Sequence, residues 1–206
     1  MEIVFVVDPM CSWCWGFAPV IEKLREKYGE RHELSLVMGG LRTRGHMEWD
    51  EGSKSYLKDN WAQVTSKTGQ SFSHALFERE KFEYDTYPAC KAVVSLRELM
   101  GMRKAFDYLH ILHKAFYLEF KDTTSLKVLI NLLQGLYVDI KKFEEFYNSS
   151  RAEILMQHDF AKARSMGANS FPSVVIIDDE GHMVCQKGYR SYEEMKRLIS
   201  IKENNA

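Results

Sequence analysis

The sequence predicts an α/β fold in which a large all-helical segment is inserted into a small sheet. Strand patterns occur only near the two ends of the chain, whereas the long stretch between them carries helical spacing. With 206 residues, the chain is long for one minimal domain and short for two, which favours one core fold with an insertion. We expect residues 1–44 and 168–206 to form the α/β part and residues 45–167 the helical insertion.

The first elements are expected to be a strand, a helix and a second strand. Residues 3–7 are all β-branched or aromatic, which is typical of a strand buried on both faces, and Asp8 ends the run. Residues 12–28 place their apolar side chains on one helical stripe and their charges on the other faces. Residues 32–38 again have a strand pattern, so this order predicts a right-handed parallel crossover.

The middle of the chain, from about residue 49 to residue 166, is expected to be helical almost throughout. The last of its helices should begin at a capping box formed by Ser150 and Glu153 and end at Gly167. The clearest of the other helical segments are residues 87–99, 103–120, 125–137 and 140–147.

Strand patterns return near the end of the chain. Residues 172–177 and 183–186 flank a short turn, which predicts a β-hairpin. A capping box that begins at Ser191 opens a last amphipathic helix, and we expect residues 202–206 to fray. The outer parts of the chain together predict a four-stranded sheet.

A Cys-x-x-Cys motif lies where the first strand turns into the first helix. Cys11 stands at the expected helix N-terminus, and Cys14 lies about one turn further in. Unpaired backbone N–H groups and the helix dipole favour an anion at Cys11, and the thiolate is the form that attacks disulfides. Because only Ser12 and Trp13 intervene, Cys14 can reach Cys11 and resolve a mixed disulfide. The motif therefore favours thiol–disulfide exchange.

Structural zinc and coincidence are the alternative interpretations of this motif. Zinc needs about four ligands, usually with a second paired motif, and Cys90 and Cys185 stand far apart without such pairing. Four cysteines are also too few for a disulfide scaffold, and isolated cysteines are more often small buried apolar residues than reactive thiols. We expect no metal and no cofactor.

A proline opens the closing hairpin, at a place where a strand tolerates it. If the Phe171–Pro172 peptide bond is cis, the backbone at Phe171 can lie against the cysteine pair and present groups to an extended substrate. An ordinary trans proline at the start of a strand is the alternative.

Residues 8–17 (DPMCSWCWGF) and residues 170–173 (SFPS) resemble the DsbA-family oxidoreductases, most closely their protein-disulfide isomerase branch without a signal peptide. The resemblance spans nearly the whole chain, because that family also divides a thioredoxin-like fold by a helical insertion. It implies that Cys11 is the nucleophile, Cys14 the resolving thiol and Pro172 the cis-proline.

The sequence departs from the best-studied members of that family at one position. They carry a buried carboxylate six residues before the first cysteine, where this chain has Phe5. Asp8, three residues before Cys11, is a candidate for the same role, and capping the turn with Pro9 is the alternative.

Aromatic side chains around the motif are candidate substrate contacts. We expect Trp13, Trp15 and Phe17 to form an apolar lip that holds the substrate, with burial in the core as the alternative. Phe171 is a further candidate substrate contact. Gly39 and Gly40 together with Arg42 could bind a carboxylate near the site, although turn glycines and a solvated arginine are the simpler interpretation.

Charge and hydropathy exclude several classes of partner. The 28 basic and 29 acidic residues nearly cancel, so we expect neither nucleic acid nor an anionic membrane surface as a partner. The start of the chain has no basic segment before its apolar run, and no stretch approaches the roughly 20 apolar residues of a membrane span. We therefore expect a cytoplasmic protein.

The expected function is that of a thiol–disulfide oxidoreductase or isomerase acting on protein or small-molecule disulfides, glutathione among them. A glutathione-dependent transferase or isomerase, of the kappa-class or hydroxychromene carboxylate isomerase type, is the alternative, because those enzymes share the divided fold. They work with a serine or a lone thiol, so Ser12 keeps this option open. A non-catalytic binding module is a third possibility, disfavoured by the position of Cys11.

Overall fold

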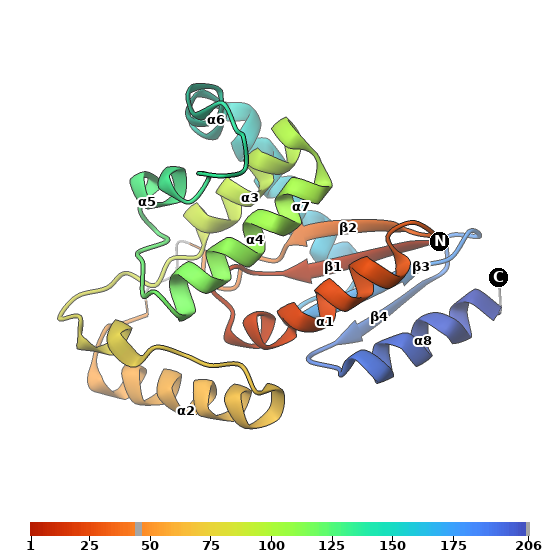
Figure 1. Ribbon diagram of the computed structural model, residues 1–206, viewed down its shortest axis with the longest axis horizontal. Helices are drawn as coiled ribbons and strands as arrows, with labels where there is room; N and C mark the ends of the chain where they lie inside the picture. Colours follow the sequence, from red (N-terminus) through yellow and green to blue (C-terminus); the bar gives the residue numbers. More distant parts are fainter. Residues whose placement is uncertain (44–46, 205–206) are drawn as a thin grey trace.

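The computed structural model describes residues 1–43 and 47–204, and this part of the chain forms one sheet with helices on both of its faces (Figure 1). The strands are β1 (Glu2–Val7), β2 (Glu33–Met38), β3 (Ser173–Ile177) and β4 (Met183–Lys187). The helices are α1 (Ser12–Tyr28), α2 (Glu51–Thr68), α3 (Tyr87–Met100), α4 (Met102–Tyr117), α5 (Leu126–Asn131), α6 (Ile140–Tyr147), α7 (Ser150–Ser165), α8 (Tyr192–Asn204) and a short 3-10 helix, η1 (His74–Glu78). The predicted α/β fold with inserted helices is confirmed.

The sheet has the strand order β2-β1-β3-β4, so the first strand of the chain lies in its interior. β1 pairs in parallel with β2 and antiparallel with β3, and β4 completes the hairpin with β3. In this register Val6 lies opposite Ser173. The turn after β1 and the segment before β3 consequently meet at the same end of the sheet.

β1 is buried on both faces, as its composition predicts. Phe5 points into the main core, where its ring meets Phe106 of α4 edge-on at 5.7 Å. Val4 and Val6 point to the opposite face and pack in a second cluster with Ala163 of α7. Figure 1 shows α1 in front of the sheet and α7 behind it. Both layers hold β1, and with it the start of α1, in place.

One buried ion pair attaches the inserted helices to the sheet. Arg97 of α3 and Asp159 of α7 form two hydrogen bonds, at 2.7 and 2.8 Å. Arg97 also donates to the Leu36 carbonyl of β2 at 2.6 Å, and Asp159 accepts from the Met38 amide at 2.8 Å. The predicted boundary between residues 44 and 45 lies outside the described residues, and a separate helical unit over 45–167 stays a prediction.

Three helix ends differ from the sequence prediction. The helix expected over 125–137 ends at Asn131, because Gly135 and Tyr137 adopt positive φ angles of 85° and 57°, which an α-helix does not allow. The helix expected to reach Phe120 ends at Tyr117, and Phe120 itself has φ 44°. Conversely, α8 includes residues 202–204 of the segment expected to fray, and residues 205 and 206 lie outside the described residues.

Candidate functional site

The two cysteines of the motif lie where β1 passes into α1. Cys11 is the N-cap residue of α1, and its carbonyl accepts the backbone amides of Cys14 and Trp15, both at 3.0 Å. The Cys11 amide donates to the Asp8 carbonyl at 3.2 Å, which closes the turn before the helix. No side chain caps this helix start, so its free N–H groups remain available to an anion at Cys11.

The two thiols differ in access. The Cys11 side chain retains 4% of its exposure, whereas Cys14 is fully buried, and both are free thiols. Burial raises the pKa of Cys14 well above its ordinary value, and the neighbouring Cys11 sulfur raises it further. Cys14 is thus held as a thiol behind Cys11. This arrangement suits a pair in which one sulfur attacks first and the other acts afterwards.

The segment before β3 lies against the cysteine pair. The Phe171–Pro172 peptide bond is cis, and the Cys11 thiol donates to the Phe171 carbonyl at 3.5 Å. Pro172 is buried, and its carbonyl accepts the Gly188 amide at 2.8 Å, which fixes it to the loop after β4. The structure therefore brings together Cys11, Cys14, Phe171 and Pro172.

Gly39, at the end of β2, makes room for Phe171. A Cβ atom added to Gly39 would lie 2.0 Å from the Phe171 ring, far inside the contact distance of real atoms. The Gly39 amide donates to the Val7 carbonyl at 2.8 Å, so the backbone cannot simply move away. The Gly39-Gly40 pair looked like a turn in the sequence, and the close approach of an aromatic ring from 132 positions later had no local signal.

We expect Gly39→Ala to displace the Phe171 ring, and with it the carbonyl that meets Cys11. The overpacked site should cost about 1–3 kcal/mol of unfolding free energy and lower disulfide-reducing turnover more than stability alone would explain. Chemical denaturation and turnover measured on the same preparation check this.

Gly52→Ala is the matched control, since the nearest atom to a Cβ there, Asp50 Oδ1, lies 3.5 Å away. It should be neutral or stabilising. Equal loss of turnover in both variants would contradict the role of Gly39 in positioning Phe171.

The aromatic residues near the motif divide into surface and core. Trp13 is half-buried, and its ring lies 6.2 Å from Tyr189, which follows β4. Tyr189 also meets the Phe17 ring at 6.1 Å. The sequence did not single out Tyr189, because no pattern marks a loop residue that will face a helix 176 positions earlier in the chain.

Trp15 does not have the predicted place in a substrate-holding lip. Its side chain is 3% exposed, stacks on Tyr117 with ring centroids 6.2 Å apart, and donates from Nε1 to the Ser71 carbonyl at 3.0 Å. The indole thus lies in the core, where its N–H has the partner that burial requires. The predictions for Trp15 and Phe17 are corrected, because Phe17 is buried in the same core, while Trp13 and Phe171 remain partly exposed.

Asp8 is buried directly beneath the cysteine pair. Its carboxylate accepts the Met10 amide at 2.8 Å and the Leu41 amide at 2.7 Å, and the Cys90 thiol donates to it at 3.4 Å. Burial raises the pKa of Asp8 despite these hydrogen bonds. The residue therefore caps the turn, as one interpretation of the sequence had it, and also places an ionisable group inside the site.

Arg42 packs against the segment before α3, and carboxylate binding by it stays a prediction. Its guanidinium lies over the Tyr84 ring at 5.6 Å, and its backbone exchanges hydrogen bonds with Thr86. The Tyr84 hydroxyl in turn donates to the Met10 carbonyl at 2.6 Å. Arg42 thus helps to hold the segment before α3 against the turn that carries Asp8.

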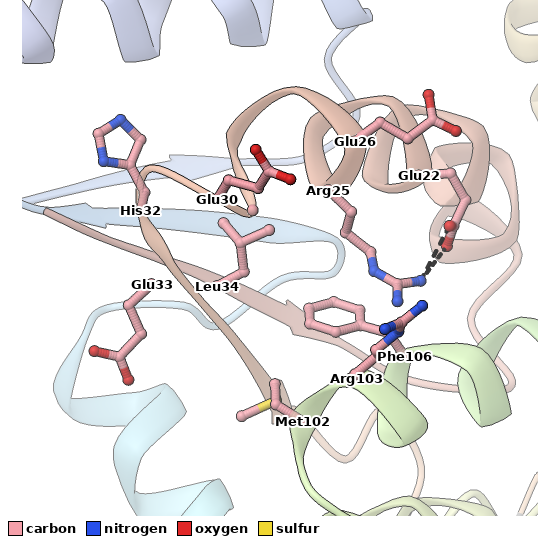
Figure 2. Close-up of a pocket in the computed structure, with 11 residues that line it drawn as sticks. Glu22, Arg25, Glu26, Glu30, His32, Glu33, Leu34, Met102, Arg103 and Phe106 are labelled. Atoms are coloured by element: carbon pink, nitrogen blue, oxygen red, sulfur yellow. Dashed lines mark hydrogen bonds and ion pairs between the residues drawn. The ribbon is translucent and has the colours of Figure 1, made fainter.

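A polar cavity of about 580 Å³ lies at the other end of α1, away from the cysteines (Figure 2). Arg25 reaches into it and is held by Glu22 and by the Phe106 ring, 4.7 Å from the guanidinium carbon. None of the four cysteines lines this cavity. We therefore place the candidate site at the exposed end of the cysteine pair and not in this hollow.

The described part of the chain shows two further features that bear on function. No helix in it is both long enough and apolar enough to cross a membrane. Over residues 1–43 and 47–204, no group of three or more histidine, cysteine, aspartate or glutamate side chains is arranged to hold a metal ion.

Solved structures resemble this chain over its full length. A candidate protein disulfide isomerase from Nitrosomonas europaea superposes with a TM-score of 0.90 at 29% identity, covering 99% of this chain and 98% of that one. The cytosolic disulfide reductase DsbM from Pseudomonas aeruginosa has a TM-score of 0.82 at 19% identity, covering 100% of both chains. DsbM has also been solved with GSH. At the identity of DsbM, the likeness concerns the fold.

Curated relatives include the ClpXP adapter protein SpxH of Bacillus subtilis, 26% identical over 204 residues and covering 97% of this chain. The chain spans 66% of the length of that relative. Residues 4–197 match the family model described as thioredoxin. Because that match takes in both the cysteine motif and the closing hairpin, the chain belongs to the thioredoxin family and has the fold of its DsbA-type thiol–disulfide oxidoreductases.

Proposed function

We propose that this protein exchanges disulfides through Cys11 and Cys14, with Cys11 as nucleophile and Cys14 as resolving thiol. The observation that carries the proposal is the order of the two sulfurs. Cys11 stands at an uncapped helix start, while the buried Cys14 lies behind it. A sulfur in the first position can meet a disulfide from outside, and one in the second can reach only the first sulfur.

Pro172 and Phe171 complete the proposed site. The Phe171 carbonyl already accepts a hydrogen bond from Cys11, so an extended substrate would lie beside this backbone segment. Half-buried Trp13 and Tyr189 flank the entrance and supply apolar area for a peptide or a small thiol compound. Proteins and small molecules that contain disulfides are the proposed substrates, and glutathione is the proposed small thiol.

The names of the relatives support this reaction in different degrees. The Nitrosomonas protein is assigned to disulfide isomerisation and DsbM to disulfide reduction, and both share the whole fold. The SpxH relatives are named as adapters. Activity of this chain must therefore be tested on the chain itself, and an isomerase role is part of the proposal.

Oxidised glutathione distinguishes the candidate functions. After incubation of the reduced protein, we expect mass spectrometry to find an internal Cys11–Cys14 disulfide, because Cys14 displaces glutathione from Cys11. A stable single adduct, or tight non-covalent binding of glutathione, would instead favour the transferase or isomerase alternative. If no cysteine reacts, a binding role such as that of the adapters is favoured.

A further inference from the structure

The carboxyl group of Asp8 lies in the protein interior among uncharged hydrogen-bond donors. The groups that stabilise its carboxylate are the Met10 and Leu41 amides, the Thr86 hydroxyl and the Cys90 thiol. The two amides belong to the backbone, so only the Thr86 and Cys90 donors can be removed by substitution. Cys90 is fully buried at the start of α3, where its thiol donates to Asp8 Oδ2 at 3.4 Å and also interacts with the Thr86 hydroxyl.

Cys14 lies against the same aspartate. The Asp8 backbone amide favours the Cys14 thiolate, while the Asp8 carboxylate disfavours it, so each group senses the protonation of the other. The two interactions require that the Cys14 sulfur and Asp8 be close neighbours. The buried Cys14 thiol can therefore give its proton to the Asp8 carboxylate beside it.

Burial shifts the pKa values of four ionisable side chains around Asp8 away from neutral pH. Burial raises the pKa values of Tyr84 and Tyr117 above the ordinary value of a phenol, and it lowers the pKa of His113 to about 3. Burial also raises the pKa of Cys90 well above that of a free thiol, so this residue stays a donor. The titratable side chains that interact with the Asp8 carboxylate are Cys14, Tyr84, Cys90 and Tyr117, and His113 Nε2 lies 3.5 Å from the Asp8 backbone carbonyl.

We propose that Cys90 is a positioning residue of the resolving step, because its thiol holds and stabilises the Asp8 carboxylate that accepts the Cys14 proton. This inference rests on the proposed function. Cys90 itself undergoes no redox change in it. The role goes beyond the two-thiol site, because it adds a third cysteine that acts only through a hydrogen bond.

The resolving step starts from a mixed disulfide between Cys11 and a substrate sulfur. The Cys14 thiol gives its proton to Asp8, and the Cys14 sulfur bonds to the Cys11 sulfur. The bond between Cys11 and the substrate sulfur breaks, and the substrate leaves as a thiolate with the electron pair. The proton on Asp8 passes to solvent or to that thiolate. The cysteine pair is oxidised and the substrate disulfide is reduced; a thiol such as glutathione restores the pair.

The pH dependence of the resolving step tests the proposal. Reduced protein is mixed with oxidised glutathione and quenched in acid at short times, and mass spectrometry measures how fast the glutathione adduct becomes the internal disulfide. The rate should rise with pH as Asp8 loses its proton. In Cys90→Ala the carboxylate loses a donor, so the midpoint should move upward by roughly half to one pH unit, and the rate below it should fall about three- to tenfold.

Three further variants distinguish a hydrogen-bonding role of Cys90 from a structural or a redox role. Cys90→Ser keeps a donor and should return the midpoint toward the wild-type value, which a merely structural or a redox role of Cys90 would not predict. Cys185→Ala is the matched thiol control and should leave the curve unchanged, since Cys185 lies in β4 away from Asp8. Thr86→Val removes the other side-chain donor and should shift the midpoint the same way, which keeps the proposal testable if Cys90→Ala does not fold.

Two results would overturn the proposal: an unchanged midpoint in folded Cys90→Ala, or equal shifts in Cys90→Ala and Cys90→Ser. Asp8→Asn should abolish the rise of the rate over the pH range in which Asp8 titrates. Failure of the proposed function would look different, because no glutathione adduct would then form on Cys11 at any pH.

Discussion

Replacing Cys11 by serine is expected to lower disulfide reduction by roughly a thousandfold or more, since the hydroxyl that remains is a far weaker nucleophile than a thiolate. Cys14 cannot substitute for it, because its sulfur is fully buried and its pKa is raised by that burial. Turnover of a model disulfide, such as the interchain bonds of insulin, measures the effect. Substantial remaining activity in Cys11→Ser would disprove the assignment of the nucleophile.

Cys14→Ala is the complementary variant and should fail at a later stage. Cys11 still attacks, but no neighbouring sulfur releases the product, so covalent adducts with substrate should accumulate. Non-reducing electrophoresis and mass spectrometry detect them, and Cys185→Ala serves as the control that forms none. Adducts on Cys90 in place of Cys11 would require the reactive thiol to be sought at the start of α3.

The largest loss of stability is expected from Asp159→Asn, which leaves the Arg97 guanidinium without its carboxylate. Side-chain exposures of 17% for Arg97 and 3% for Asp159 place this pair largely out of water. Breaking such a pair should cost about 3 kcal/mol of unfolding free energy, or roughly 10 °C in Tm for a chain of this size. Denaturant and thermal unfolding give both values.

Two controls separate the ion pair from general effects of the substitution. Glu145→Gln removes one partner of an exposed pair with Lys141 on α6 and should not change stability measurably. The double variant Arg97→Met with Asp159→Leu leaves no buried charge unpaired, so it should be more stable than Asp159→Asn. A double variant that is less stable would show that packing, and not the unpaired charge, dominates this position.

The sheet and most helices could be predicted from the sequence, because their signals are local. A β-branched run predicted β1, and the turn residues predicted the β3–β4 hairpin. The start of α7 was predicted to within one residue, but the capping box of Ser150 with Glu153 was wrong, because Ser149 is the N-cap and its hydroxyl accepts the Ala152 amide. The helix predicted after Asn131 was wrong, because the apolar spacing there is helical although Gly135 and Tyr137 adopt positive φ angles. Positive φ at a tyrosine depends on tertiary packing, which periodicity does not report.

In the candidate site, too, the features with local sequence signals could be predicted, and those that depend on distant contacts could not. The position of Cys11 at a strand-to-helix junction could be read from neighbouring residues. The space that Gly39 leaves for Phe171, the burial of Trp15, and the bond from Cys90 to Asp8 join residues that are distant in the chain. Each of these depends on how the inserted helices and the closing hairpin pack against the first strand, and no single segment carries that information.

The pairing of β1 with β3 sets the order in which a newly made chain becomes able to react. The ribosome releases the cysteine pair early, whereas the Phe171 carbonyl that meets Cys11 follows 160 positions later. β2 can pair with β1 while the chain is still short, but the other edge of β1 waits for β3. A nascent chain thus displays the two thiols without the backbone that lies beside them, and the proposed exchange site is complete only once β3 has left the ribosome.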